Sequence, residues 1–290
     1  MNFSDLVCFG ELLWDIYEDG EEKIGGAPFN VAAIASMKGI KTTMITAAGT
    51  DGQGKRIRAA AGEKVNLICQ TNKHKTGTVR VILSKEKTPI FDIEEDVAYD
   101  YIIFDDTIKD ICADAKFLCF GTLAQRCNVS RKTLGKIFKV TNAVKIYDFN
   151  YRDGINEWES IFKKSIKQTD ILKVNETELG LLKILYKSDQ SDEAFVNTLI
   201  QKYGLRYVFV TRGSKGASLY AEKKVLHRDA SKIEVTDTTG CGDAFTAGIV
   251  YALLNNSDEE RILEYAIELA GKIASVKGAV PDNVEYLTDF

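Results

Sequence analysis

The sequence predicts an α/β fold in which one doubly wound, mostly parallel sheet carries a small β-sheet lid. Short apolar runs of strand length alternate with helix-like segments from Leu6 to Lys277, which is typical of repeated βαβ units. Right-handed crossovers between such strands place helices on both faces of a sheet. Two insertions, at about 12–25 and 72–104, show strand-like alternation of their own and would form the lid. We expect residues 1–290 to form a single domain.

The composition limits the classes of function. The chain has 290 residues, of which 45% are hydrophobic, so it can bury a large core. Its 38 basic and 42 acidic residues are well mixed, without the basic stripe that nucleic-acid binding requires, and we expect no nucleic-acid partner. No cationic and apolar leader opens the sequence, and its longest apolar run, at 244–254, is about half of a membrane span. We therefore expect a cytoplasmic protein without a membrane partner.

Histidine and cysteine are poorly placed for two common kinds of site. His74 and His227 have no neighbouring partner motif, which argues against a histidine-based zinc site and against a Ser-His-Asp relay. The six cysteines form no C-x-x-C pair, and most of them are expected to be core thiols.

The first expected strand, at 6–9, leads to a candidate ligand-binding carboxylate. Asp15 lies just beyond the carboxyl end of this strand, and open α/β sheets bind ligands at that edge. The Asp15 carboxylate could accept hydrogen bonds from sugar hydroxyls. A solvated aspartate in a turn is the alternative interpretation.

The next segment predicts the start of a helix beside the same edge. Gly25 and Gly26 permit close approach of a ligand, Pro28 suits a first helical position, and Gly39 would end the helix. Asn30 falls in the first turn, where its amide could both donate to and accept from a polyol. It could equally be an ordinary polar residue at a helix start.

The segment 49–56, after a strand expected at 42–47, is a near match to the phosphate-binding P-loop. Arg56 stands where that loop needs a hydroxyl to hold Mg²⁺, so we reject a P-loop NTPase. The segment more plausibly forms a turn beside the substrate edge.

A hairpin is expected between two alternating runs at 76–83 and 89–93, with a polar turn at 84–88. Together with 14–24 it could form the small projecting sheet. An edge hairpin without a functional role would give the same alternation.

The strands expected in the second half of the sheet each end near polar residues. Arg126 follows one such strand and could meet an anionic group or a sugar hydroxyl, although a surface arginine is the commoner case. The expected strands are 116–120, 144–147, 171–174, 207–210 and 217–220. A capping box at 257–260 begins a long amphipathic helix towards Ala274.

A glycine-rich loop near the C-terminus predicts the reactive centre. After a strand-like stretch at 233–235, Gly240 and Gly242 let backbone N–H groups converge at the start of an apolar helix, which favours an anion there. Asp243 in the first turn should stay ionised and could take a proton from a hydroxyl. The Cys241 thiol should react more readily than the buried cysteines if the helix dipole outweighs the nearby carboxylate. An ordinary glycine turn with a helix-start aspartate is the alternative.

The two motifs G-G-x-P-x-N at 25–30 and D-T-T-G-x-G-D-A-F at 237–245 resemble those of the ribokinase (PfkB) family of sugar kinases. The segments 76–83, 89–93, 97–100 and 121–126 resemble bacterial fructokinases within it. The resemblance implies a ribokinase-like fold, ATP as phosphoryl donor, Mg²⁺ and a sugar hydroxyl as acceptor.

The resemblance also implies roles for individual residues. The catalytic residues would be Gly240, Cys241, Gly242 and Asp243. The sugar-binding residues would be Asp15, Gly25, Gly26, Asn30 and Arg126. The ATP side is expected to comprise Asn150, Arg152, Asn175, Glu178, Thr211, Gly213 and Gly216. Glu178 would orient hydrated Mg²⁺, although Asn175 and Glu178 also fit a capping box. Asp237 and Gly278 match positions that would hold K⁺.

The predicted function is therefore an ATP-dependent sugar kinase, with fructose as the expected acceptor. Other acceptors remain open, namely 2-keto-3-deoxygluconate, ribose or a nucleoside, as does a non-catalytic sugar-binding regulator. A homodimer formed through the lid is also open. An NAD-dependent oxidoreductase is disfavoured because no G-x-G-x-x-G opens the first βαβ unit.

Overall fold

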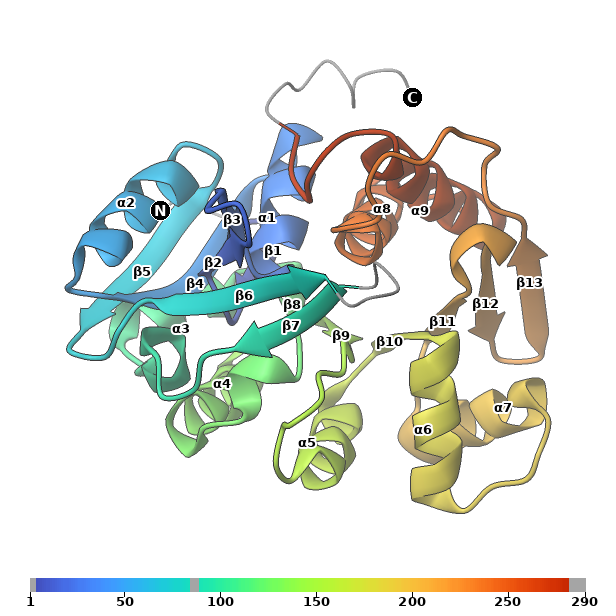
Figure 1. The fold of residues 1–290 in the computed structure, drawn as a ribbon. Coiled ribbons are helices and arrows are strands. Elements are labelled where there is room, and N and C mark those ends of the chain that lie inside the picture. Colours follow the sequence, from blue (N-terminus) through green and yellow to red (C-terminus); the bar gives the residue numbers. More distant parts are fainter. Residues whose placement is uncertain (1–3, 84–88, 282–290) are drawn as a thin grey trace.

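The computed structural model describes residues 4–83 and 89–281 and confirms the α/β architecture with two sheets (Figure 1). The polar turn expected at 84–88 lies outside the described residues. Among the described residues, the larger sheet has nine strands in the order β13-β12-β11-β10-β9-β8-β1-β4-β5. These strands are β1 (Leu6–Phe9), β4 (Thr42–Gly49), β5 (Asn66–Asn72), β8 (Phe117–Phe120), β9 (Val144–Asp148), β10 (Ile171–Asn175), β11 (Tyr207–Thr211), β12 (Ala217–Ala221) and β13 (Lys224–Arg228).

The strands from β5 to β11 in this order are all parallel, and β12 alone runs in the opposite direction, pairing antiparallel with both β11 and β13. The central strands are buried on both faces, which explains their continuous apolar sequences. The order of connection reverses between β1 and its two neighbours, β4 and β8, so the sheet has a switch point beside β1.

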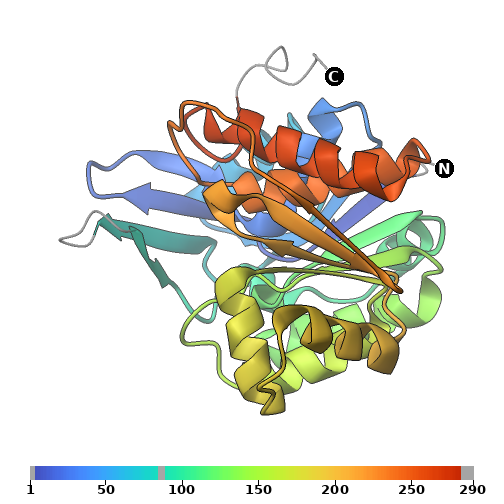
Figure 2. The same ribbon diagram turned by 90° about the vertical axis from the view of Figure 1, so that its right-hand side faces the viewer.

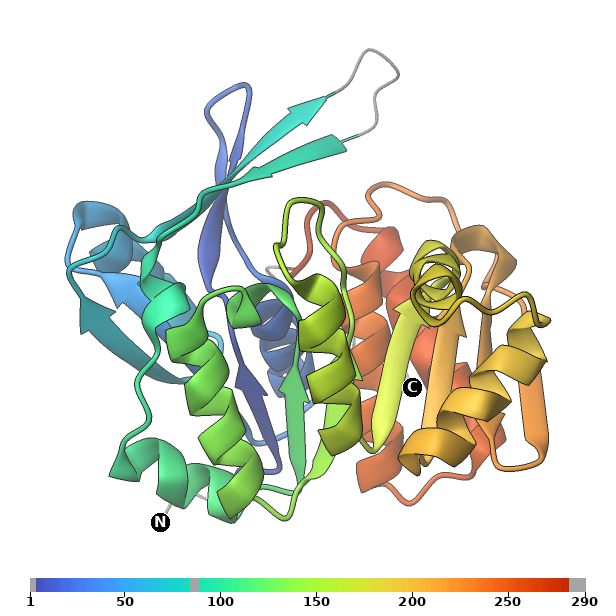
Figure 3. The same ribbon diagram turned by 90° about the horizontal axis from the view of Figure 1, so that it is seen from below.

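Two helical layers cover the two faces of the larger sheet (Figures 1 and 3). Side chains of α1, α2, α8 and α9 share one core with alternate residues of the strands, and those of α3 to α7 share the other. The helices of the first layer are α1 (Ala27–Met37), α2 (Gly52–Gly62), α8 (Cys241–Leu254) and α9 (Glu259–Ala274). Those of the second are α3 (Asp106–Ala113), α4 (Asn128–Val140), α5 (Trp158–Ser165), α6 (Glu176–Tyr186) and α7 (Asp192–Tyr203).

The smaller sheet projects from the body of the molecule (Figures 2 and 3) and has the order β3-β2-β6-β7. Its strands are β2 (Leu13–Tyr17), β3 (Glu22–Gly25), β6 (Gly77–Leu83) and β7 (Pro89–Ile93), all within the two expected insertions. Asp51 anchors this sheet at the start of β6. The Asp51 carboxylate caps α2 through the Gly54 N–H and accepts from both the N–H and the hydroxyl of Thr76, the residue before β6. The near match to a P-loop is therefore a helix cap.

Two local predictions were wrong. The stretch 233–235 is not a strand, because it lies on the surface, with 38% of Ile233 and 59% of Val235 exposed, and it pairs with no strand among the described residues. At α9 the cap is Asp258 rather than Ser257, and its carboxylate accepts from the Arg261 N–H at 2.9 Å. None of the helices described here has both the length and the apolar character needed to cross a membrane.

Candidate active site

The parallel strands bring most of the expected nucleotide-side residues to one edge of the larger sheet. Asp148 ends β9, Asn175 ends β10 and Thr211 ends β11. Asn175 and Thr211 are direct cross-strand partners. Because all three strands run in the same direction, their carboxyl ends share the edge at which open α/β sheets bind ligands.

The glycine-rich loop forms the start of α8, as the sequence predicted. Gly240 has φ of 78°, a left-handed conformation that favours glycine, and a Cβ there would come within 2.6 Å of the Ala279 Cα. Helix α8 begins at Cys241, which places Asp243 in its first turn. The Cys241 N–H donates to the Thr238 carbonyl at 3.3 Å, whereas the N–H groups of Gly242 and Asp243 have no partner among the described residues and are therefore available to an anion.

Asp243 is buried and lies against the candidate sugar-binding residue Asn30. The Asn30 Nδ2 donates to Asp243 Oδ2 at 2.8 Å, so the first turns of α1 and α8 meet at these two side chains. Burial, followed by the negative charge of Asp148, raises the pKa of Asp243 to about 7. The expectation of a fully ionised Asp243 was therefore wrong at neutral pH, because burial outweighs the Asn30 hydrogen bond and the charges of Lys173 and Arg152.

The Cys241 thiol does not have the lowered pKa that a helix start ordinarily favours. Burial, with the charges of Asp237 and Asp243, raises the pKa of Cys241 to about 11. Two carboxylates and burial thus outweigh the helix dipole, and only a small fraction is thiolate at neutral pH. Heightened reactivity of Cys241 is not supported.

The paired glycines are required by two neighbouring carboxyl-bearing residues. A Cβ on Gly25 would come within 2.2 Å of Asp15 Oδ2, and one on Gly26 within 2.4 Å of the Glu11 carbonyl oxygen. Asp15 itself lies in β2 of the smaller sheet rather than in a turn beyond β1. Burial raises the pKa of Asp15 to about 6, against the opposing charges of Arg152 and Lys23.

Three buried polar atoms near this region have no hydrogen-bond partner among the described residues. They are Glu11 Oε2, Asn30 Oδ1 and the hydroxyl of Tyr99. Burial raises the pKa of Glu11 to about 7, with Asp243 adding to the shift and Arg152 opposing it. Unpaired buried polar atoms are costly in a folded protein, so these three are candidates for contact with a polar ligand.

Sequence reasoning missed Glu11 and Tyr99. Glu11 could have been found by its position, because it follows β1 by one residue at the ligand-binding edge. Nothing in the sequence indicated that the Tyr99 hydroxyl would be buried without a partner.

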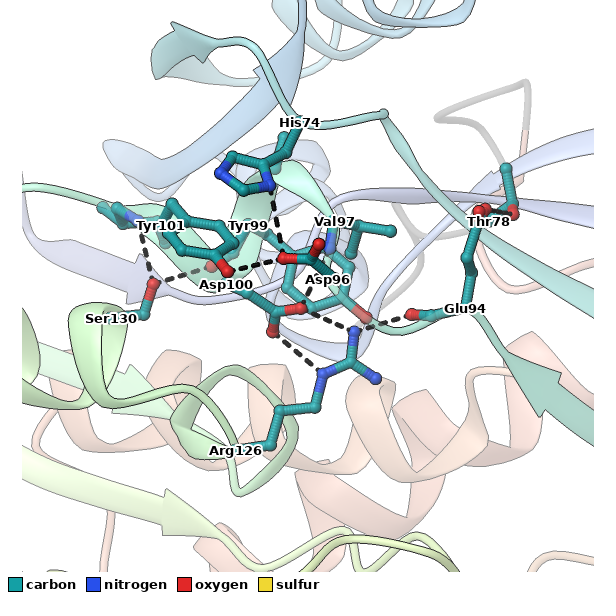
Figure 4. Close-up of polar contacts among 12 residues, drawn as sticks. His74, Thr78, Glu94, Asp96, Val97, Tyr99, Asp100, Tyr101, Arg126 and Ser130 are labelled. Atoms are coloured by element: carbon teal, nitrogen blue, oxygen red, sulfur yellow. Dashed lines mark hydrogen bonds and ion pairs between the residues drawn. The ribbon is translucent and has the colours of Figure 1, made fainter.

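Arg126 is held by a network at the base of the smaller sheet (Figure 4). Its Nε and Nη2 donate to the two carboxylate oxygens of Asp100 at 2.9 and 2.8 Å, and Nη2 also donates to the Glu94 carbonyl. The guanidinium carbon lies 5.2 Å from the centre of the Tyr99 ring. Only Nη1 has no partner among the described residues, so a sugar contact by Arg126 stays a prediction that would have to use this atom.

Asn175 and Glu178 form the capping box that the sequence allowed. The Glu178 N–H donates to Asn175 Oδ1 at 2.8 Å, and the Asn175 N–H donates to Glu178 Oε2 at 2.7 Å. The second oxygen of Glu178 accepts from the Tyr151 N–H at 2.8 Å, which joins the box to the loop after β9. Burial raises the pKa of Glu178 above its ordinary value, although the charge of Lys173 opposes this.

The loop after β9 carries Asn150 and Arg152 towards the same edge. Asn150 has φ of 39°, an uncommon conformation for a residue other than glycine. The charge of Arg152 opposes the upward pKa shifts of Glu11, Asp15 and Asp243.

The turn between β11 and β12 contains the last two expected nucleotide-side glycines. Gly213 and Gly216 have φ of 54° and 83°. A Cβ on Gly216 would come within 2.0 Å of the Arg228 carbonyl oxygen, so glycine is required by close packing against the end of β13.

The structure brings together the two residues expected to hold K⁺. The Gly278 N–H donates to Asp237 Oδ2 and the Thr239 N–H to Asp237 Oδ1, both at 2.9 Å. Burial opposes ionisation of Asp237, but these hydrogen bonds hold the pKa of its carboxyl below the usual value. Within residues 4–83 and 89–281, no group of three or more His, Cys, Asp or Glu side chains is arranged to hold a metal ion.

A buried ion pair that the sequence did not reveal lies beneath the glycine-rich loop. Lys173 of β10 donates to both oxygens of Asp148 at 3.0 Å, and the Thr246 hydroxyl of α8 donates to Asp148 Oδ2 at 3.0 Å. Asp148, the last residue of β9, is the cross-strand partner of Lys173, the middle residue of β10.

The arrangement of an aspartate and two glycines at the start of α8 can be compared with known proteins. The sequence model of the pfkB family carbohydrate kinase matches residues 5–285. The chain belongs to the PfkB family of carbohydrate kinases.

Several PfkB relatives and solved structures are similar to this chain over most of its length. PH1459 of Pyrococcus horikoshii, an uncharacterized sugar kinase, is 30% identical over 87% of this chain and 83% of its own. Its complex with ATP superposes with a TM-score of 0.77, at 27% identity over 94% and 93% of the two chains. The fructokinase of Salmonella typhimurium is 25% identical over 93% of each chain. The fructokinase of Xylella fastidiosa with bound ATP shares the fold, with a TM-score of 0.86 at 19% identity over 96% and 94%.

The PfkB assignment confirms the resemblance seen in the sequence and the ribokinase-like fold. The protein is accordingly an ATP-dependent sugar kinase.

Proposed function

We propose that this kinase transfers the γ-phosphoryl group of ATP to a hydroxyl of fructose. The contact between Asn30 and the buried Asp243 carries the proposal, because it joins a candidate sugar-binding amide to a candidate base at the start of α8. The fructokinase relatives support the choice of fructose.

The proposed roles follow from the positions of the side chains. Asp243 takes the proton of the acceptor hydroxyl. The hydroxyl oxygen forms the new bond to the γ-phosphorus, while the bond between that phosphorus and the bridging oxygen, which leaves with ADP, breaks. The N–H groups at Gly240 to Gly242 stabilise the negative charge of the transferring group. Asp15, Asn30 and the unpaired oxygen of Glu11 would bind sugar hydroxyls.

A divalent cation fits the site mainly through the phosphates of ATP. Both oxygens of Glu178 already accept a backbone N–H, so we propose that Glu178 meets Mg²⁺ through water rather than directly. When bound with ATP, Mg²⁺ would neutralise phosphate charge. Arg152 and the loop after β9 would position the nucleotide beside it.

We expect K⁺ to raise the rate by ordering the loop that carries the anion-binding N–H groups. Asp237 stays ionised and is fixed against Gly278, and a carboxylate with backbone carbonyls suits a hard monovalent cation. Turnover should be several times faster in KCl than in tetramethylammonium chloride at equal ionic strength. Equal rates in the two salts would contradict a K⁺ site, and the variant Asp237→Asn should respond less to K⁺ than the wild type.

A sugar panel with Mg-ATP tests the proposed acceptor. Fructose should give the highest kcat/KM when compared with ribose, 2-keto-3-deoxygluconate and a nucleoside, measured by coupled release of ADP. A tenfold preference for any of the other three would overturn the fructose assignment. Failure to phosphorylate any sugar, in protein that binds fructose, would instead favour a non-catalytic regulator.

A further inference from the structure

Lys173 places a buried positive charge directly behind the glycine-rich loop. Its Nζ lies only 2.8 Å from the position that a Cβ would take on Gly242. The side chain of Lys173 is 8% exposed, so water screens its charge poorly. The ammonium group therefore sits within a few ångströms of the backbone that would bind the transferring phosphoryl group.

The pairing of Lys173 accounts for only part of its hydrogen-bonding capacity. Two of the three ammonium N–H groups bind the two oxygens of Asp148. The third has no partner among the residues that the structure describes. Asp148 also accepts from the Thr246 hydroxyl of α8, so part of its hydrogen-bonding capacity is directed to a second partner.

We propose that Lys173 is a positioning residue that holds a fixed positive charge behind Gly242 and so stabilises the phosphoryl group in flight. The proposal rests on the kinase function of the site, and it adds a cation that neither the glycine motif nor the near match to a P-loop supplies. Fixed charges of this kind act strongly because the site is dry and need not reorganise during the reaction.

This role gives Gly242 a second reason to be glycine. A side chain at position 242 would displace the Lys173 ammonium as well as obstruct the anion. The charge of Lys173 also opposes the upward pKa shift of Asp243, which keeps more of the base ionised. The competing interpretation is that Lys173 serves only to neutralise Asp148.

Replacing both Lys173 and Asp148 by neutral residues distinguishes the two interpretations. Lys173→Gln alone would leave Asp148 buried and unpaired, so the test uses Lys173→Gln combined with Asp148→Asn, which can retain a hydrogen bond without either charge. Lys173→Met with Asp148→Leu is the second neutral pair, in case the first fails to fold. The matched control is Lys145→Gln with Asp170→Asn, because these residues also link β9 to β10, at the opposite end of the strands.

The readouts are kcat with the sugar that the wild type phosphorylates fastest, and the affinities for ADP and for ADP with aluminium fluoride. Choosing that sugar keeps the test independent of the fructose assignment. The neutral pair should lower kcat about 100-fold and weaken the ADP–aluminium fluoride complex similarly, while the affinity for ADP alone changes less than threefold. The control pair should keep the wild-type values.

A folded neutral pair that retains more than a third of the wild-type kcat would show that Lys173 only neutralises Asp148. Equal weakening of ADP and of the aluminium fluoride complex would overturn the proposal as well, because it would indicate a general distortion of the nucleotide side.

Discussion

The variant Asp243→Asn is expected to lose about two to four orders of magnitude in kcat while remaining folded. Asparagine keeps the shape of the side chain and can still meet Asn30, but it cannot take the hydroxyl proton. Steady-state kinetics on the preferred sugar, with circular dichroism to check the fold, would measure the effect. Asp258→Asn is the matched control, because Asp258 caps α9 away from the glycine loop and asparagine caps equally well. Near-normal turnover of folded Asp243→Asn would exclude this residue as the base.

The same residue predicts a pH dependence of activity. Because burial and Asp148 raise the pKa of Asp243 to about 7, the base is largely protonated below neutral pH. The wild-type kcat/KM should rise about tenfold per pH unit below this value and level off above it. The residual activity of Asp243→Asn should lack this rise.

Stability should respond in the opposite sense. The folded state binds a proton at Asp243 up to about pH 7, whereas the unfolded chain releases it near the ordinary pKa of 3.8. The stabilisation is therefore complete below the unfolded pKa and is lost as the pH rises to the folded pKa. Asp243→Asn, which carries no charge to bury, should have a higher Tm than the wild type at pH 8. The difference should shrink towards pH 5, as differential scanning calorimetry can test.

Gly26→Ala is expected to cost about 3 kcal/mol of stability or more, with a fall in Tm of about 5 °C or more and a large loss of activity. Gly26 has φ of 110°, which strains any other residue, and the new Cβ would come within 2.4 Å of the Glu11 carbonyl oxygen. The Gly26 carbonyl also accepts from the Asn30 N–H at 2.9 Å. A shift of this backbone would therefore move Asn30 away from Asp243.

Gly39→Ala provides the matched control for Gly26→Ala, because it lies just beyond the other end of α1. Gly39 also has a positive φ, of 79°, but a Cβ there would have nothing within 4 Å. It should cost only the backbone strain, about 1 kcal/mol, and leave kcat unchanged. If the two variants lose the same stability, the contact with Glu11 is not what requires glycine at position 26.

Elements with strong apolar patterns were predictable from the sequence, and elements stabilised by their neighbours were not. β1, β8 and β10 are buried on both faces, so their sequences are apolar and unambiguous. β13 was missed because it is a largely exposed antiparallel edge strand with a polar sequence. The stretch 233–235 has the opposite character, being apolar and β-branched but exposed and unpaired.

The site was predictable where a motif is contiguous. The glycine loop places Asp243 as expected because a helix start fixes its neighbours within a few residues. Lys173 and Asp148 become partners only through the register of β9 and β10, which the sequence does not state. The raised pKa of Asp243 was not expected, and the direction for Cys241 could not be decided from the sequence, since burial is a property of the packed fold and not of the motif.

Because the smaller sheet is anchored at one end, a small rotation at that end would produce a larger movement at the other. Its strand β6 has seven residues, so at about 3.3 Å per residue its last residue lies about 20 Å beyond its first. A pivot would lie where Asp51 binds the fully buried Thr76. A rotation of about 10° there would carry the far end by about 3.5 Å, by the same rise per residue. Substitutions near Asp51 should consequently change the reach of the sheet more than substitutions near its far end.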